Sequence, residues 1–562
     1  MKILKFLFSL VLTIGLVYLL HSPQKVQDND VPPLGHFFSP FSGFWQNAES
    51  PEHFASRHLE ISGMKGKVSV KFDERMVPHI FAGNLEDATF AQGYITAMFR
   101  LWQMDMISRL SGGRLAEVMG DRLLDNDKLQ RRRGMVHGAM NNLKGWQKSP
   151  ENFALIQSYA AGVNSYVLSL KPKDFPLEFK LLNYTPEHWT ALKSALVKKY
   201  MDKTLCSGED DLESTNALQV FGQEMFDKLY PEYNPKQTPV IPAGTKWDFA
   251  PATVDAPAPV QEAVGLLDQE LPPKEREHVG SNNWAVSGTK TKSGKPILCN
   301  DPHLRLTLPS IWFEIQIHTP GMNAYGVSIP GIPGILIGFN EHAAWGETNV
   351  GQDVTDWYKI NWTDAAQTSY EWDGGVKKAA LVVDTFWVKG QRAPVLDTVK
   401  WTVWGPVVYD DPTNPRAGMA MRWLAHDEPN PEDIATFLGL NKSRNYNDYR
   451  EALSNYDYPA QNFVFASNDG DIAITANGKF PLKLKEQGRF VQDGSYSGNA
   501  WKGFIPRDQI PAIKNPERGF VASANQHTTD PTYPYYYNAM SFDDFRARYL
   551  VGELSKMDNI TP

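Results

Sequence analysis

Cysteine is scarce in this chain of 562 residues, which contains only Cys206 and Cys299. The two lie far apart and match none of the spacings of zinc sites, so no cysteine-based metal site is expected. Positive charge is not in excess either, because the formal net charge is −8. Nucleic acid is therefore not an expected partner. The basic run at 131–133 is too short to change this, and a solvated face or local ion pairs explain it better.

The sequence also lacks the short motifs of several large enzyme classes. It contains no G-x-S-x-G, H-E-x-x-H, C-x-x-C, P-loop or G-x-G-x-x-G. The glycines of "GIPGILIG" at 331–338 have the wrong spacing for a dinucleotide. A conventional serine hydrolase with an unrecognised triad stays open as an alternative.

Residues 1–22 form the one long hydrophobic run, "MKILKFLFSLVLTIGLVYLLHS". Two lysines precede the apolar stretch, as in a secretory signal peptide or an amino-terminal anchor. About 18 apolar residues is a borderline length for crossing a bilayer, and no cleavage site is obvious. We expect an exported protein, either periplasmic or anchored to the membrane and facing the exterior.

The rest of the chain divides into a helical part and a strand-rich part. Residues 84–230 read mainly as helices, the first capped by Asn84 and ended by a Gly-Gly pair at 112–113. From residue 281 onward short alternating runs and turn residues predict strands. This order predicts an α+β architecture. Residues 248–280 are rich in proline, alanine and acids without apolar periodicity, so we interpret them as a spacer between a region at 23–247 and a region at 281–562.

Gly280 and Ser281 stand where the spacer meets the first strand. If the chain were cut between them, the new α-amino group would lie on the same residue as the serine hydroxyl. Its pKa of about 7.7–8.0 lets it act as a base near neutral pH, which is a known variant of nucleophile activation. Gly-Ser pairs usually form turns, so the pair alone also fits an ordinary turn.

Longer blocks around this pair carry a specific resemblance. They are "VGSNNWAVSG", "ILCNDPHL", "GIPGILIGFNEHAAWGETNVGQDVTDWY", "PAQNFVFASNDGDI" and "FVASANQ", with "FRLWQMDMISRLSGGRLAEVMG" and "SYAAGVNSYV" in the helical part. From about residue 65 to the end, the chain resembles the penicillin acylase family of amino-terminal-nucleophile hydrolases. The resemblance implies a four-layer αββα fold and a precursor that cleaves itself into an α/β heterodimer. It also implies hydrolysis of amides of apolar acyl groups, such as a penicillin, a cephalosporin or an acyl-homoserine lactone.

The resemblance further implies roles for single residues. Ser281 matches the nucleophile, with its own amine as base, and His303 matches the position that hydrogen-bonds this amine. The oxyanion hole is expected to use a main-chain N–H of Asn349 or Val350 together with the side-chain amide of Asn525.

Two further features belong to the predicted site on the same grounds. Arg548 in "FRARYL" matches a family arginine near the nucleophile. The acyl pocket is expected to be lined by aromatic residues, with candidates near 98–102 and 312–313. The sequence does not reveal which acyl group or which leaving amine is used.

The resemblance also implies one structural calcium ion, for which hard oxygen ligands are suited. The matching ligands are Asp211, Asp353, the Thr355 carbonyl, Asp356 and a carbonyl near Gly488. Close rivals of Asp211 are Glu209, Asp210 and Glu213. A further acid of the family is replaced by Tyr536 and Tyr537, so an absent calcium site stays open.

Family β-chains normally continue well beyond the block that holds Arg548, whereas this sequence stops at "MDNITP". A fragment is therefore one interpretation. An inactive acylase-like remnant, which binds acyl amides without cleaving them, is the other.

Overall fold

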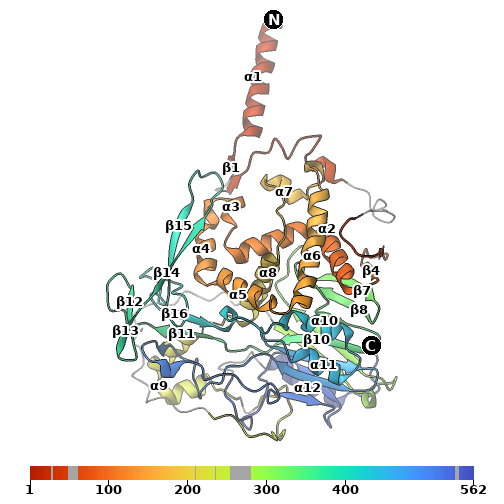
Figure 1. The fold of residues 1–562 in the computed structure, drawn as a ribbon, viewed down its shortest axis with the longest axis vertical. Helices are drawn as coiled ribbons and strands as arrows, with labels where there is room; N and C mark the ends of the chain where they lie inside the picture. The colour runs from red at the N-terminus through yellow and green to blue at the C-terminus, as the bar shows by residue number, and fades with distance from the viewer. Residues whose placement is uncertain (27–28, 49–60, 209, 235, 254–279, 538–543) are drawn as a thin grey trace.

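The computed structural model describes residues 1–562 except 27–28, 49–60, 209, 235, 254–279 and 538–543. Helix α1 (Lys2–His21) projects away from the rest of the molecule and buries none of its residues (Figure 1). It is long and apolar enough to cross a membrane, with a mean hydropathy of 2.4 over its most apolar window. A signal sequence passes the same test, so the helix is consistent with the predicted export.

The helical part follows a two-stranded hairpin, β3 (Val68–Phe72) and β4 (Pro78–Ala82). As predicted, the Asn84 side chain caps its first long helix by accepting from the Asp87 N–H at 2.8 Å. The helices are α2 (Leu85–Gly112), α3 (Ala116–Met119), α4 (Leu124–Arg132), α5 (Met135–Trp146), α6 (Pro150–Ser169), α7 (Leu177–Leu182), α8 (Ala191–Cys206) and α9 (Asp211–Leu229).

Helices α2 and α6 pack so closely that glycine is required at their contact. A Cβ on Gly93 would lie 2.1 Å from the Tyr159 carbonyl oxygen, and one on Gly162 would lie 1.9 Å from that of Phe90. The two glycines therefore let the backbones touch, which gives the helical layer a rigid centre.

The strand-rich part forms one large sheet and one small sheet. The large sheet has the order β20-β18-β17-β10-β9-β8-β7-β4-β3, and the small one has the order β21-β5-β6. Their further members are β5 (Gly280–Val286), β6 (Ile297–His303), β7 (Phe313–Thr319), β8 (Met322–Ser328), β9 (Ile337–Phe339), β10 (Ala343–Asn349), β17 (Gln461–Ser467), β18 (Ile472–Asn477), β20 (Ala512–Lys514) and β21 (Phe520–Ser523). Strand β4 joins the large sheet parallel to β7, which links the two halves of the chain.

Smaller elements surround these sheets. A third sheet has the order β16-β11-β19, and two hairpins stand apart as β12/β13 and β14/β15. The remaining elements are β11 (Thr355–Lys359), β12 (Ser369–Trp372), β13 (Gly375–Lys378), β14 (Ala380–Phe386), β15 (Val395–Trp401), β16 (Ala420–Trp423), β19 (Gln492–Asp493), α10 (Thr436–Lys442), α11 (Tyr446–Leu453) and α12 (Phe545–Lys556).

The alternation of side chains along the strands reveals the order of the layers. On β17, Phe463 packs with residues of α2, whereas the next residue, Val464, packs with Ala285 of β5. On β5, Val286 points the other way and packs against Leu554 of α12. The layers are thus helices, large sheet, small sheet and helix. The predicted four-layer αββα architecture is confirmed.

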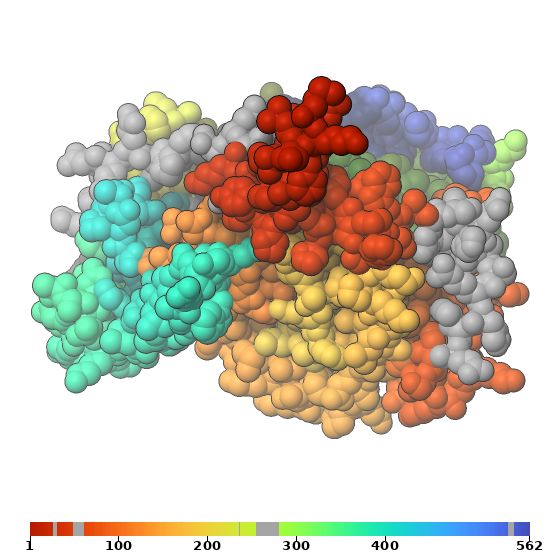
Figure 2. All heavy atoms as spheres, turned by 90° about the horizontal axis from the view of Figure 1, so that it is seen from above, coloured from red at the N-terminus to blue at the C-terminus, as the bar shows by residue number. Residues whose placement is uncertain are grey.

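The β14/β15 hairpin forms a projection beside the helices at one edge of the molecule (Figure 2). Arginines of α4 hold it there. Arg131 Nη1 lies 2.9 Å from Asp384 Oδ1, and Arg132 Nε lies 2.7 Å from Asp397 Oδ2. The interpretation of the basic run as local ion pairs is confirmed for these two residues.

Candidate active site

Ser281 lies on β5, the middle strand of the small sheet, and is 7% exposed. Its Oγ donates to the carbonyl oxygen of Gly280 at 2.6 Å. The hydroxyl therefore lies directly against the peptide group that it is predicted to attack. The backbone N–H of Ser281 donates to Asn525 Oδ1 at 2.5 Å.

Asn525 connects Ser281 to the end of β10. Its backbone has a φ of 68°, a left-handed conformation that asparagine tolerates better than most residues. The fully buried side chain accepts from Ser281 and donates from Nδ2 to the Asn349 carbonyl at 2.9 Å. The Val350 N–H donates to the Ala460 carbonyl at 3.3 Å. The structure brings the predicted oxyanion residues together, with the Asn525 amide and the Val350 N–H engaged by main-chain carbonyls.

The structure does not bring Arg548 to the nucleophile. Arg548 pairs with Asp544 at 3.2 Å and has a partly exposed side chain. Arg546, two residues earlier on α12, contacts the site instead: it donates to the Ser281 carbonyl at 2.8 Å and to Asn525 Oδ1 at 3.0 Å. Sequence reasoning missed it because two arginines stand in the same short block.

The predicted hydrogen bond of His303 concerns the free Ser281 amine of a cut chain. In this uncut chain the Ser281 nitrogen is a peptide N–H, which donates to Asn525 Oδ1. The backbones of His303 and Gly280 do pair across β5 and β6. The imidazole Nε2 instead lies 2.8 Å from Asp301 Oδ2 and 3.3 Å from Asn282 Nδ2. The contact with His303 lowers the pKa of Asp301. Asp301 is thus a local carboxylate partner for this histidine.

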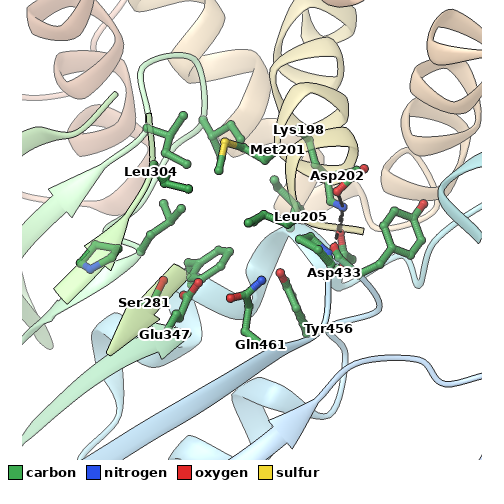
Figure 3. Close-up of a pocket in the computed structure, with 18 of the residues that line it drawn as sticks. Lys198, Met201, Asp202, Leu205, Ser281, Leu304, Glu347, Asp433, Tyr456 and Gln461 are labelled. Atoms are coloured by element: carbon green, nitrogen blue, oxygen red, sulfur yellow. Dashed lines mark hydrogen bonds and ion pairs between the residues drawn. The ribbon is translucent and has the colours of Figure 1, made fainter. Parts of the chain in front are cut away.

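A cavity with about 780 Å³ of empty volume, its open mouth included, lies beside Ser281 (Figure 3). Most of its wall is apolar and comes from α8, α10 and the loops that follow β6 and β8. Of the aromatic residues predicted for it, Trp312 lines the cavity, whereas Phe313 packs in the core and Phe99 against it. Trp102 lines a different hollow. No sequence pattern marked the other apolar lining residues, which include Met201, Leu205, Leu304, Ile329, Ile332, Leu336, Ile434, Phe437, Tyr456 and Tyr458.

One end of the cavity carries buried charges. Lys198 Nζ lies 3.1 Å from Asp202 Oδ1 and 3.8 Å from Asp433 Oδ2 (Figure 3). Burial raises the pKa of Asp433 to about 6. These residues come from α8 and from the segment before α10, so no local motif marks them as one cluster.

The predicted calcium ligands meet around a lysine. Lys483 Nζ lies 2.9 Å from Asp353 Oδ2 and 2.8 Å from Asp356 Oδ1, and its side chain is fully buried. A Cβ on Gly488 would lie 2.5 Å from the same ammonium. The ammonium therefore lies among the groups that were expected to surround the metal.

The remaining predicted ligands have partners of their own. Asp211 Oδ2 accepts from the Trp357 N–H at 3.0 Å. The side chain of Thr355, whose carbonyl was the predicted ligand, donates from Oγ1 to the Cys206 carbonyl at 3.3 Å. The rival Glu213 pairs with Arg416 at 2.9 Å, and Glu209 lies outside the described residues. Over the described part of the chain, no group of three or more His, Cys, Asp or Glu side chains could hold a metal. These residues do not fit a calcium ion.

Comparison with known proteins decides the family. A family model described as penicillin amidase matches residues 67–562. The chain belongs to the penicillin amidase family. This confirms the resemblance seen in the sequence.

Relatives of this penicillin amidase family member carry names of acylases. Acyl-homoserine lactone acylase QuiP of Pseudomonas aeruginosa is 28% identical over 84% of this chain and 56% of its own length. Penicillin acylase 2 proenzyme of Pseudomonas sp. (strain SE83) is 26% identical over 89% of this chain and 63% of its own. A solved penicillin G acylase from Alcaligenes faecalis is 24% identical, with a TM-score of 0.45 over 50% of each chain. The chain thus spans less than two thirds of the length of these curated relatives.

Proposed function

We propose that this protein is an acylase that hydrolyses the amide bond of an apolar N-acyl compound after cutting itself between Gly280 and Ser281. The observation that carries the proposal is the place of Ser281: its hydroxyl lies 2.6 Å from the Gly280 carbonyl oxygen, and its side chain also lines an apolar cavity. One hydroxyl can thus serve both reactions. The names of the relatives, which include acyl-homoserine lactone and penicillin acylases, support the same reaction class.

The cut would proceed in two steps. The Ser281 hydroxyl attacks the carbonyl carbon of Gly280, the hydroxyl proton passes to the Ser281 nitrogen, and the C–N bond breaks to leave an ester and a free amine. Water then hydrolyses the resulting ester between Gly280 and Ser281. Ser281 becomes the first residue of a β-chain, and its α-amine is close to its own hydroxyl.

The amidase reaction would use the same atoms. The Ser281 hydroxyl attacks the acyl carbonyl of the substrate, its proton passes to the α-amine, and the amine delivers it to the leaving nitrogen. Water then hydrolyses the acyl ester. The oxyanion would be bound by Asn525 Nδ2 and a main-chain N–H at Asn349 or Val350, once these donors leave their present carbonyl partners.

We further propose that the protein is exported and assembled from two chains. Cleavage would give an α/β heterodimer, with the segment before residue 281 removed in part. The exposed apolar helix α1 would direct export, to the periplasm or to the outer side of a membrane that it anchors.

Mass spectrometry and amino-terminal sequencing of the purified protein test the proposal, together with hydrolysis of phenylacetyl and fatty-acyl amides. We expect a chain that starts at Ser281 and turnover of at least one amide. An uncut chain without hydrolysis would instead support the inactive remnant. Hydrolysis by an uncut chain would support a conventional serine hydrolase.

Arg546 gives a sharper test of the site. Arg546→Leu removes the donors to the Ser281 carbonyl and to Asn525 Oδ1. The Asn525 side chain then loses the charged hydrogen-bond partner that fixes its orientation. A hydrogen bond to a charged group contributes about 1.5–3 kcal/mol, so we expect self-cleavage and kcat to fall roughly 10- to 100-fold. Arg548→Leu is the matched control from the same helix and is expected to leave both rates nearly unchanged. Equal effects of the two substitutions would contradict the assignment of Arg546.

A further inference from the structure

Four side chains that line the cavity have a buried polar atom without a hydrogen bond. Asp202 and Asp433 form ion pairs with lysines through these atoms, whereas Glu347 and Gln461 do not. Glu347 Oε1 is buried without a hydrogen bond, and no described residue forms an ion pair with this carboxyl group. Gln461 Nε2 is also buried without a hydrogen bond, on a side chain that is only 4% exposed. Buried polar atoms without partners are rare in folded proteins. Two of them in one cavity indicate a ligand that supplies the missing hydrogen bonds.

The sheet places both groups beside each other. Strands β10 and β17 are neighbours, and their register pairs Glu347 with Phe463 and Asn349 with Gln461. Glu347 and Gln461 are therefore diagonal neighbours on one face of the sheet. Figure 3 shows both at the same side of the cavity as Ser281.

Asn300 links the backbone of Glu347 to the strand that carries the nucleophile. Its side chain accepts from the Glu347 N–H at 2.8 Å and donates to the Glu347 carbonyl at 2.9 Å. The same Nδ2 donates to the carbonyl of Asn282, the residue after Ser281, at 3.1 Å. Asn300 thus ties the Glu347 backbone to the strand of the nucleophile, and the side chains of Glu347 and Ser281 line the same cavity.

Burial also changes the ionisation of this carboxyl group, raising the pKa of Glu347 to about 8. The group is mostly protonated at pH 7, so it can donate as well as accept a hydrogen bond. The surrounding wall is apolar, apart from the charged cluster at the other end of the cavity.

A hydroxyl group satisfies both side chains, because it can donate to Glu347 Oε1 and accept from Gln461 Nε2. We propose that Glu347 and Gln461 select acyl groups that carry a hydroxyl near the carbonyl end of an otherwise apolar chain. This inference rests on the proposed acylase function and specifies its substrate class.

The test compares the para-nitroanilides of octanoic acid, α-hydroxyoctanoic acid and β-hydroxyoctanoic acid. We expect the mature protein to prefer at least one hydroxylated substrate by about tenfold or more in kcat/KM, because a site built for a hydroxyl discriminates against its absence. Glu347→Leu and Gln461→Leu should each reduce or reverse this preference. Glu347→Gln should retain most of it, because the amide still donates and accepts.

Ile434→Val is the matched control. It changes the volume of the same cavity without changing its hydrogen bonds, so it should alter kcat/KM for all three substrates by a similar factor. Equal turnover of the plain and hydroxylated substrates by the wild-type protein would overturn the inference. It would mean that water satisfies Glu347 and Gln461.

A binding measurement separates this inference from the proposed function. The Ser281→Ala chain, titrated calorimetrically with the unsubstituted amides of the same acids, should bind a hydroxylated amide more tightly, and Glu347→Leu in this background should abolish the difference. If that holds while the wild-type protein hydrolyses nothing, the selectivity stands and the acylase function fails. Hydrolysis without any selectivity, or no selective binding, rejects the role of Glu347 and Gln461.

Discussion

Ser281→Ala is expected to give a single uncut chain that hydrolyses no amide. The hydroxyl is the group that would attack both the Gly280 carbonyl and the substrate, and alanine removes it without changing the strand. Loss of a hydrolase nucleophile lowers kcat on the order of 10⁶-fold. Mass spectrometry of the purified chain and an assay with the most reactive amide measure the two effects.

Ser281→Cys separates the two reactions. A thiol can also form the ester-like intermediate with Gly280, so the cut can survive while substrate turnover falls. If Ser281→Ala were still cut before residue 281 and still hydrolysed amides, the mechanism proposed for Ser281 would be wrong. Activity in a wild-type chain shown to be uncut would contradict it equally.

Lys483→Met is expected to destabilise the protein strongly. It leaves Asp353 and Asp356 facing each other in a buried site without their ammonium partner. Removing one partner of a buried ion pair costs about 3–5 kcal/mol. The measurement is the midpoint of thermal unfolding of the variant beside the wild-type protein, with the exposed neighbour changed in Lys485→Met as a control that should shift it little.

Removing or adding calcium tests whether the Lys483 ammonium or a metal ion lies between Asp353 and Asp356. Chelator should leave the unfolding midpoint of the wild-type protein unchanged, since Lys483 occupies the place between the carboxylates. In Lys483→Ala, which removes the ammonium and opens space, added calcium should raise the midpoint because the ion binds only the folded state. A fall of the wild-type midpoint in chelator would contradict the assignment of Lys483 and restore the calcium prediction.

Much of the fold could be predicted because its signals are local. The apolar run at the amino terminus, the Asn84 cap and the alternating strands after residue 281 each depend on neighbours within a few positions. The motif blocks, taken in their order along the chain, identified the family. The family in turn implied the layered architecture and the role of Ser281. Asn525 was predicted because its position in the block "FVASANQ" matches the family, although Gln526 beside it is also an amide.

Local signals did not identify the arginine that lies near the nucleophile. Arg546 and Arg548 share one block, but residues two apart on a helix point roughly 200° apart. Only the packing of α12 on the small sheet decides which of them reaches Asn525. His303 is a similar case, because strand pairing placed its backbone correctly while the side chain turned to Asp301.

The sequence by itself determined the family, the two halves of the chain and the serine at their junction. Tertiary structure alone decided that Lys483 enters the acidic cluster from about 130 positions away, and that Glu347 and Gln461 share one cavity wall. The physical reason is that these contacts depend on how strands and helices distant in sequence pack together. The direction of each side chain is then set by burial and by the available partners, which no local pattern records.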